Sequence, residues 1–255
     1  MSHCVIIDIS VDGIRIFKSS LVELWPILFR IVNTKEKIYP FPVGLFVGLH
    51  KPNNVNDFFE DFVEEVLSLN SKIEMGGKEV KLVFRCLIAD TPAKAFVCGI
   101  PSHSSKHGCS KCTQVAKQVA VKCGKKTVKA LTYETVNGAL ISDEDFASRI
   151  HKSHHAEDFR ENKTPLEKIS FNMITQVPLD GMHLIDLGVM KKILIRIIER
   201  KTVEKTPKKI FQKYRQSWLN LECAFQKNFQ ESLDHWMKYI FGKPLNFISF
   251  SLTLE

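Results

Sequence analysis

The segment CVIIDISVDGIRIF, residues 4–17, decides the fold. Its first seven residues are rich in β-branched side chains and alternate in character, which predicts a strand over 4–10. Asp12-Gly13 is a pair typical of tight turns. Ile14, Ile16 and Phe17 then continue the pattern, so the sequence predicts a β-hairpin whose turn carries a carboxylate.

The elements outward from this hairpin follow from periodicity. Residues 41–49 (FPVGLFVGL) predict a third strand, and their Pro and Gly content favours an edge or a bulge. Residues 55–69 have the apolar spacing of an amphipathic helix. Residues 80–89 (VKLVFRCLIA) predict a fourth strand, after which Pro92 can open a helix. Because a helix separates strands three and four, the fourth strand should run parallel to an earlier one.

This order of elements is that of the RNase H-like α/β fold, a mixed sheet with helices. That fold sets one carboxylate on its first strand and another at the end of its fourth. Asp12 and Asp90 stand at those two places, and Asp8, four residues before Asp12 on the same strand face, is the alternative to Asp12. Each also has a plain structural interpretation, because aspartate is common in turns (Asp12) and at helix N-caps (Asp90).

The charge balance favours a polyanionic partner. The 255 residues carry a net charge of +8, and no acidic residue stands between Asp90 and Glu134. A second basic run covers residues 191–215. Lysines in such segregated runs suit a DNA phosphate backbone, although a solvated basic face is the alternative. The candidates for phosphate contact are Lys106, Lys111, Lys122, Lys125, Lys126, Lys129, Lys191 and Lys192.

Other functional classes find no support in the sequence. There is no Gly-rich phosphate loop, no GxSxG motif and no site for a small-molecule substrate. No stretch is apolar and long enough for a bilayer, and no signal peptide is recognisable, so we expect an intracellular protein without a membrane partner. In that reducing setting Cys109 and Cys112, two residues apart among seven cysteines, favour a metal site over a disulfide.

Several motifs together resemble the catalytic domain of CACTA (En/Spm-like) DNA transposases. They occur in order over about residues 5–200. The resemblance implies a nuclear cut-and-paste transposase, or a protein derived from one, that acts on DNA. It also implies that Asp12 and Asp90 belong to an acidic triad holding two Mg²⁺ or Mn²⁺ ions, which cleave and join phosphodiesters. The matching stretches are DGIRIFKSS (12–20) with Trp25-Pro26-Ile27, ADTPAKAF (89–96), GCSKC (108–112), His154-His155, PLDGMHL (178–184) and GVMK (188–191).

The resemblance assigns further site residues. Asp180 and His183 should lie near the metal centre, where His183 would steer the scissile phosphate or orient a water. The alternatives are an N-cap for Asp180 and a core position for His183. For the cysteine pair, the family pattern offers His154 and His155 as the remaining ligands of a structural Zn²⁺. Adjacent histidines can both ligate only if the backbone turns there, so four alternative ligands stay open: His151, His103, His107 and Cys123. A pair of free thiols that binds no metal is the other interpretation of Cys109 and Cys112.

The expected organisation has four parts. Residues 1–107 form the first part of the core, and 108–170 a polar insertion held by zinc because it lacks an apolar core. Residues 171–200 continue the core with a fifth strand over 177–182 and a helix over 184–200, and 201–255 form a helical region with helices over 206–220 and 221–241 and a strand-like tail.

One expected ligand is missing. The family's third acid is a Glu on a late helix, and neither Glu222 nor Glu231 has the surrounding pattern. We therefore expect that this chain alone does not cleave DNA. The alternative function is a non-catalytic, zinc-containing module that binds nucleic acid or protein. The sequence leaves the oligomeric state open, a homo-oligomer included.

Overall fold

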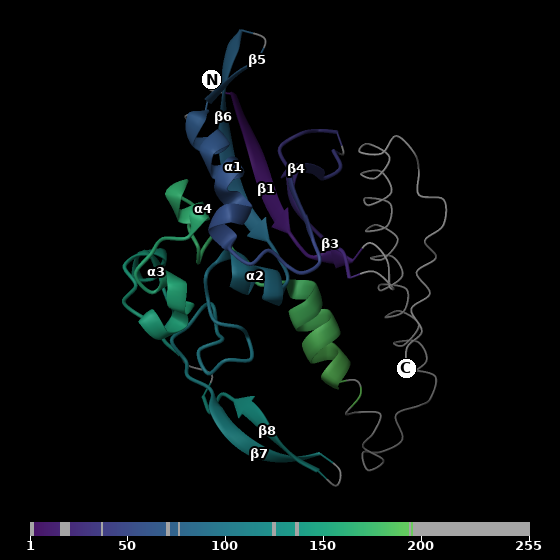
Figure 1. The fold of residues 1–255 in the computed structure, drawn as a ribbon, viewed down its shortest axis with the longest axis vertical. Helices are drawn as coiled ribbons and strands as arrows, with labels where there is room; N and C mark the ends of the chain where they lie inside the picture. The colour runs from purple at the N-terminus through teal and green to yellow at the C-terminus, as the bar shows by residue number, and fades with distance from the viewer. Residues whose placement is uncertain are drawn as a thin grey trace, which may run out of the picture.

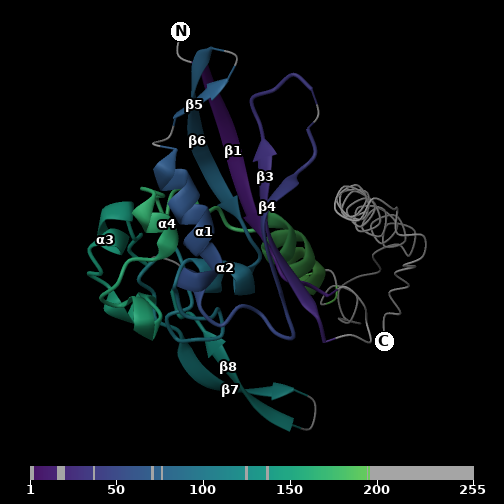
Figure 2. The same ribbon diagram turned by 45° about the horizontal axis from the view of Figure 1, so that its top comes forward.

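The computed structural model describes residues 3–15, 21–36, 38–69, 72–75, 77–123, 126–135, 138–193 and 195. These residues form a mixed α/β structure with a curled six-stranded sheet, a separate two-stranded ribbon and several helices (Figures 1 and 2). The helices expected over 206–220 and 221–241 and the strand-like tail lie outside the described residues. Among the described residues, no helix combines the length and apolar composition that a bilayer span requires.

The first strand does not turn back at Asp12-Gly13. Strands β1 (His3–Val11) and β2 (Ile14–Arg15) pair antiparallel with the same partner, β3 (Glu23–Ile31), in one continuous register. The predicted hairpin is therefore wrong, and the returning strand is β3. Gly13 has a different purpose: a Cβ there would lie 2.8 Å from the Trp25 ring. The glycine permits a close approach of the indole to the backbone, which a local turn rule does not detect.

The third predicted strand is confirmed as an edge with a bulge. Strand β4 (Phe41–Gly48) pairs with β3, and the register shifts between Ile27 and Leu28. The extra residue of this bulge falls in the stretch containing Pro42 and Gly44, residue types that weaken regular pairing.

The crossover predicted from the helix is also confirmed. Helix α1 (Val55–Ser68) is capped by Asn54 and leads through the short strand β5 (Lys72–Met75) into β6 (Lys78–Ile88). Strand β6 pairs antiparallel with β5 on one side and parallel with β1 on the other. Helix α1 packs on one face of this sheet, where Phe59 is fully buried together with Ile9 of β1 and Leu87 of β6 (Figure 1).

The parallel pair β1–β6 contains a β-bulge that changes its register. Ile7 pairs with Phe84 before the bulge, and Ser10 pairs with Ile88 after it. Arg85 is the extra residue, and its guanidinium donates to both carboxylate oxygens of the buried Asp8, at 2.7 and 2.6 Å. The ion pair thus lies at the point where the register changes.

The polar insertion packs against the core more than its sequence predicts. It contains β7 (Lys117–Cys123), β8 (Lys126–Thr132), α3 (Asp143–Ala147), η1 (Lys152–His154), η2 (Glu157–Phe159) and α4 (Pro165–Lys168). Ile141, Phe146 and Phe159 join the main hydrophobic core. The expectation of a segment without an apolar core is therefore wrong for residues 141–168, and only the ribbon β7–β8 stands apart.

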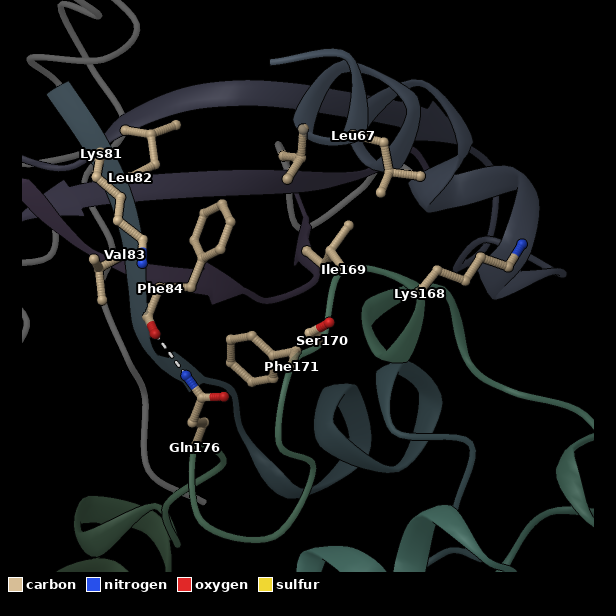
Figure 3. Close-up of a pocket in the computed structure, with 11 residues that line it drawn as sticks. Leu67, Lys81, Leu82, Val83, Phe84, Lys168, Ile169, Ser170, Phe171 and Gln176 are labelled. Carbon is tan, nitrogen blue, oxygen red and sulfur yellow. Dashed lines mark hydrogen bonds between the residues drawn. The ribbon is translucent and has the colours of Figure 1, made fainter. Parts of the chain in front are cut away.

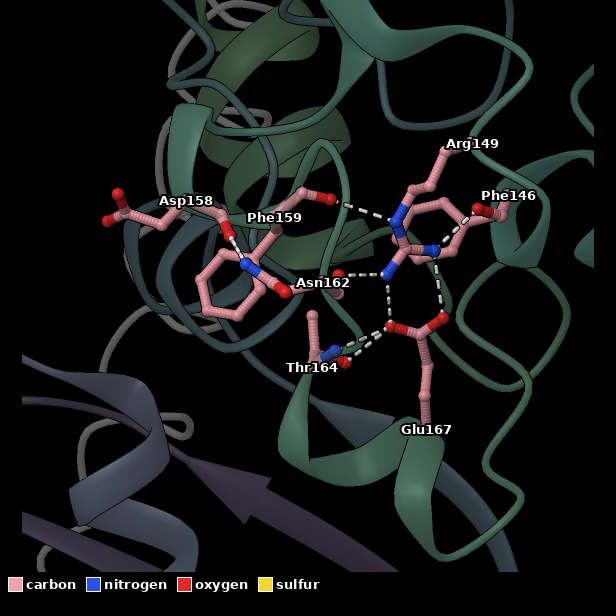
Figure 4. A network of polar contacts seen from close by, with 7 residues as sticks. All are labelled: Phe146, Arg149, Asp158, Phe159, Asn162, Thr164 and Glu167. Carbon is pink, nitrogen blue, oxygen red and sulfur yellow. Dashed lines mark hydrogen bonds and ion pairs between the residues drawn. The ribbon is translucent and has the colours of Figure 1, made fainter.

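A buried ion pair between Arg149 and Glu167 holds the short helices of this insertion together (Figure 4). Arg149 uses all five of its N–H groups, donating to three backbone carbonyls and to both carboxylate oxygens of Glu167. Glu167 also accepts from the backbone N–H and the hydroxyl of Thr164 at the start of α4. Both charged side chains are at most 7% exposed. Their bonds connect α3, η2 and α4, which share few regular backbone hydrogen bonds.

The predicted fifth strand over 177–182 is not formed. The carbonyls of Ile174 and Val177 accept hydrogen bonds from the Lys111 ammonium instead of from a neighbouring strand. Only Gln176 reaches the edge of β6, where its carbonyl accepts from the Leu87 N–H at 2.8 Å and its amide donates to the Phe84 carbonyl at 2.5 Å. A helix follows, whose π-helical part η3 (Met182–Met190) begins before the predicted start at 184.

We predict that Glu167→Gln strongly destabilises the fold. Removing one charge of a buried pair leaves Arg149 without its counter-ion, at a cost of about 3–5 kcal/mol in unfolding free energy. The matched control is Glu161→Gln, since Glu161 pairs with Lys152 in an exposed ion pair, which should cost less than about 1 kcal/mol. Urea unfolding of both variants measures the difference, and equal losses would contradict a structural role for the Arg149–Glu167 pair.

Candidate active site

Asp12 and Asp90 lie at the same edge of the sheet because their strands are parallel. The last pair in the ladder of β1 and β6 is Ser10 with Ile88, and each aspartate stands two residues further along. Burial and, next to it, the negative charge of Asp90 raise the pKa of Asp12 to about 6. The charge of Asp180 also raises this pKa, whereas His183 lowers it. Asp12 is therefore within electrostatic reach of the other three residues predicted for the acidic site.

The plain structural interpretation holds for Asp90, which caps a helix, but not for Asp12, because the chain does not turn there. One carboxylate oxygen of Asp12 accepts from the Gly13 N–H at 2.8 Å. One carboxylate oxygen of Asp90 accepts from the Ala93 N–H at 2.7 Å and caps helix α2 (Thr91–Val97). The second oxygen of each takes no hydrogen bond from the residues that the structure describes. These hydrogen bonds therefore fix the position of both carboxylates through one oxygen each.

Asp180 and His183 form a dyad beside these carboxylates. The Nδ1 atom of His183 lies 2.5 Å from one Asp180 oxygen, and the other oxygen accepts from the N–H groups of Met182 and His183. Asp180 is thus an N-cap, as its alternative interpretation stated. His183 is 48% exposed, so the core position considered for it is wrong. With Nδ1 bound to Asp180, the Nε2 atom of His183 remains for an outside partner.

The negative charge of Asp8, the alternative to Asp12, is balanced by the guanidinium of Arg85. Its side chain is 2% exposed, and Cys86 approaches it at 3.2 Å in addition to Arg85. Burial raises the pKa of Asp8, but the hydrogen bonds from Arg85 and Cys86 and the positive charge of Arg85 outweigh it and hold the pKa below the ordinary value. A carboxylate already paired with a guanidinium is a poor cation ligand, so Asp12 is the better candidate.

The residues predicted to bind zinc are only partly together. The Sγ atoms of Cys109 and Cys112 lie 3.2 Å apart, and His154 lies beside them with Nδ1 at 3.4 Å from the Cys109 carbonyl. The other ring nitrogen of His154 faces His107 at 3.5 Å. His155 lies elsewhere, with its ring 4.5 Å from that of Phe146. His107, one of the open alternatives, thus lies beside His154, whereas His155 does not lie with the cysteines.

His155 behaves as a core residue. It is 2% exposed, its Nδ1 atom has no hydrogen-bond partner, and burial lowers its pKa to about 4. The ring of His151 lies 6.3 Å from that of His154, and His103 is exposed. For Cys123 the structure describes only the backbone, at the end of β7. In the described part of the chain, no three His, Cys, Asp or Glu side chains are arranged to hold a metal ion.

Most of the lysines predicted to contact phosphates have side chains that the structure describes, and all of these except Lys111 are exposed. Lys106, Lys122 and Lys129 are exposed, as are Lys191 and Lys192 on the last helix. Lys126 is described only by its backbone in β8, and Lys125 lies outside the described residues. The prediction that Lys111 contacts phosphates is wrong, because its ammonium group donates hydrogen bonds to the carbonyls of Ile174 and Val177. Burial lowers the pKa of Lys111, as does the nearby charge of Lys94.

A groove of about 440 Å³ lies away from the acidic site (Figure 3). It runs along the free edge of β6 between the end of α1 and the segment that follows α4, with Phe84 and Phe171 in its floor. Its only titratable side chains are Lys81 and Lys168. The groove therefore contains no acid and no nucleophilic side chain beyond the Ser170 hydroxyl, and it is not a candidate active site.

Comparison with known proteins yields no assignment. No model of a known protein family matches the chain, and no curated protein matches it either.

We predict that Asp12→Asn stabilises the protein increasingly as the pH rises. The folded protein binds a proton at Asp12 with a pKa of about 6, above the 3.8 of an ordinary aspartate, so ionisation of Asp12 between these values costs folding free energy. Asparagine does not ionise. The unfolding free energy of the variant relative to the wild type should therefore rise from pH 4 to 7, by on the order of 1–3 kcal/mol, and then stay constant.

Denaturant unfolding across this pH range measures the effect. Asp158→Asn, at an exposed carboxylate on η2, is the control and should give a flat difference. A flat difference for Asp12→Asn as well would contradict the raised pKa of Asp12.

Proposed function

We propose that this chain carries an RNase H-like nuclease core of the CACTA transposase type, descended from an enzyme that cleaves and joins DNA strands. The observation that supports this most strongly is the convergence of Asp12 and Asp90, 78 residues apart, at the ends of adjacent parallel strands. Asp180 and His183, assigned from the same resemblance, lie within electrostatic reach of Asp12. Four residues from three separate segments thus gather as the proposal requires.

The carboxylates fit a divalent cation. Asp90 lies near enough to Asp12 for its charge to contribute to the raised pKa of Asp12, and each carboxylate has an oxygen that no described hydrogen bond uses. Hard cations such as Mg²⁺ and Mn²⁺ prefer carboxylate oxygens. Asp12 and Asp90 would hold the cation, which when bound supplies charge neutralisation for a phosphodiester and a more acidic water.

The role of the dyad follows from its hydrogen bonds. Asp180 accepts from Nδ1 of His183, which fixes the ring and sets its tautomer. In this tautomer the exposed Nε2 atom of His183 accepts a hydrogen bond, such as one from a water next to Asp12, and it donates to a phosphate oxygen only when the ring is protonated. His183 orients the substrate or accepts a proton at Nε2, while Asp180 acts only through the histidine.

We infer that this constellation is catalytically incomplete. Strand cleavage by two ions needs carboxylates for both, and in the described residues both oxygens of Asp180 are used by its own helix and by His183. The exposed lysines support the alternative function, a nucleic-acid-binding module without catalysis. Cation binding and cleavage must therefore be tested separately.

We predict that the protein binds Mn²⁺ and that Asp12→Asn or Asp90→Asn abolishes this binding. Electron paramagnetic resonance of free Mn²⁺ measures it, with Asp158→Asn as the control that should bind like the wild type. The same samples are then incubated with supercoiled plasmid and Mg²⁺ or Mn²⁺, and we expect no steady nicking.

Two outcomes would change the proposal. Mn²⁺ binding that survives both substitutions, or is missing from the wild type, would contradict the metal site. Robust nicking that Asp90→Ala abolishes would confirm the carboxylates as catalytic and contradict the inferred incompleteness.

We further propose that Cys109 and Cys112 bind a structural zinc ion with help from the imidazole cluster beside them. The two thiols are adjacent, and His154 and His107 lie close, but the side chains as placed do not form a complete tetrahedral set. Such a zinc would fix the base of the ribbon β7–β8. Through His154 it would also be tied to residues 141–168, which are held together independently by the core and the Arg149–Glu167 pair.

We predict about one zinc per purified chain, lost in the double variant Cys109→Ser/Cys112→Ser. Elemental analysis after dialysis measures the stoichiometry, with Cys4→Ser, at an exposed cysteine, as the control that should retain zinc. His107→Ala or His154→Ala should weaken retention, whereas His155→Ala should not. A wild-type protein that refolds in zinc and holds none would contradict this site.

A further inference from the structure

The ribbon formed by β7 and β8 extends away from the rest of the chain. In Figures 1 and 2 it leaves the body at the end opposite the β5–β6 hairpin. Its seven residue pairs run in regular antiparallel register from Lys117↔Thr132 to Cys123↔Lys126. An isolated two-stranded ribbon is marginally stable in water, so a feature of this kind points to a partner that covers it.

The base of the ribbon is anchored to the body. The Ala116 N–H donates to the Lys106 carbonyl at 2.7 Å, and the Thr113 N–H donates to the Ala139 carbonyl at 2.9 Å. An isolated bridge pairs Cys112 with Leu140. Past these contacts both strands are free, and both faces of the ribbon are open to solvent.

The register divides the described side chains between two faces. On one face Lys129 and Lys122 are diagonal neighbours, because Lys122 pairs with Thr127 and Ala120 pairs with Lys129. Both lysines are exposed, and within the described residues neither forms an ion pair. No acidic residue occurs in either strand. The other face carries small apolar side chains that are 38–45% exposed: Val119, Val121 and Val128.

We propose that the β7–β8 ribbon enters the major groove of duplex DNA. A two-stranded β-ribbon has the dimensions that this groove admits, and apolar side chains can contact thymine methyl groups there. The unpaired lysines match the charge of the phosphates that line the groove. Short side chains over most of the ribbon let the backbone approach the bases. The inference rests on the proposed function only for the choice of DNA as the partner.

The experiment is duplex binding by the full chain, measured by fluorescence anisotropy over a range of salt concentrations in a buffer without chelator and without added Mg²⁺ or Mn²⁺. Any zinc at the base of the ribbon is then kept, and binding does not depend on a cation at the acidic site, so failure of that metal proposal leaves this test intact. The wild type should show a linear fall of log affinity with log salt. The double variant Lys122→Ala/Lys129→Ala should reduce the steepness by about two, since each lost phosphate contact removes about 0.9.

The matched control is Lys78→Ala/Lys163→Ala, at exposed lysines outside the ribbon, which should keep the wild-type steepness. Blocking the major groove by methylation of guanine N7 should weaken wild-type binding more than that of the ribbon variant. Circular dichroism checks that every variant is folded.

Three outcomes would overturn the proposal. The first is equal steepness for the ribbon and control variants, and the second is binding that ignores major-groove methylation. The third is a change of mass in solution for Val121→Ser/Val128→Ser with unchanged DNA binding. That result would make the apolar face of the ribbon an interface between copies of this chain.

Discussion

The bulge in the parallel pair β1–β6 is the constraint on which the acidic site depends. Before it, Ile7 lies level with Phe84, and after it Ser10 lies level with Ile88. Continuing the later register brings Asp12 level with Asp90, whereas the earlier register would bring it level with Ala89, whose side chain is buried. A one-residue slip reverses the face of every following side chain. The pair Asp8–Arg85 at the bulge therefore holds the register that lets the two aspartates meet.

A second group of interactions builds the insertion on this sheet. Helix α1 and the sheet bury Phe59, Ile9 and Leu87 together, and Phe146 and Phe159 extend that core into the insertion. The network of Arg149 and Glu167 joins the short helices there. Lys111 holds the carbonyls just before η3, the helix that carries His183. The position of the dyad is thus set by contacts far from it in sequence.

The sequence predicts what depends on local pattern. The strands β1, β4 and β6, helix α1 and the Asp90 cap follow from periodicity and capping rules. The glycine at position 13 does not follow from these rules, because it is required by the close approach of the Trp25 ring on β3. The ribbon β7–β8 was missed because neither of its faces is buried, so the apolar alternation that marks a half-buried strand is weak. His155 packs against Phe146, and His107 instead lies beside His154. The spacing of residues along the chain cannot show such a tertiary contact.

Asp8 and Asp12 separate a structural carboxylate from a functional one. They stand four residues apart on the same extended segment. Asp8 is fully buried, yet Arg85 holds its pKa below the ordinary value. Asp12 has no cationic partner of this kind: its burial and, next, the negative charge of Asp90 raise its pKa to about 6. A fold selected for stability alone would neutralise both, since unrelieved repulsion costs free energy. Under the proposed function, a cation bound at Asp12 and Asp90 would relieve this repulsion, and the unrelieved repulsion is the physical argument for that proposal.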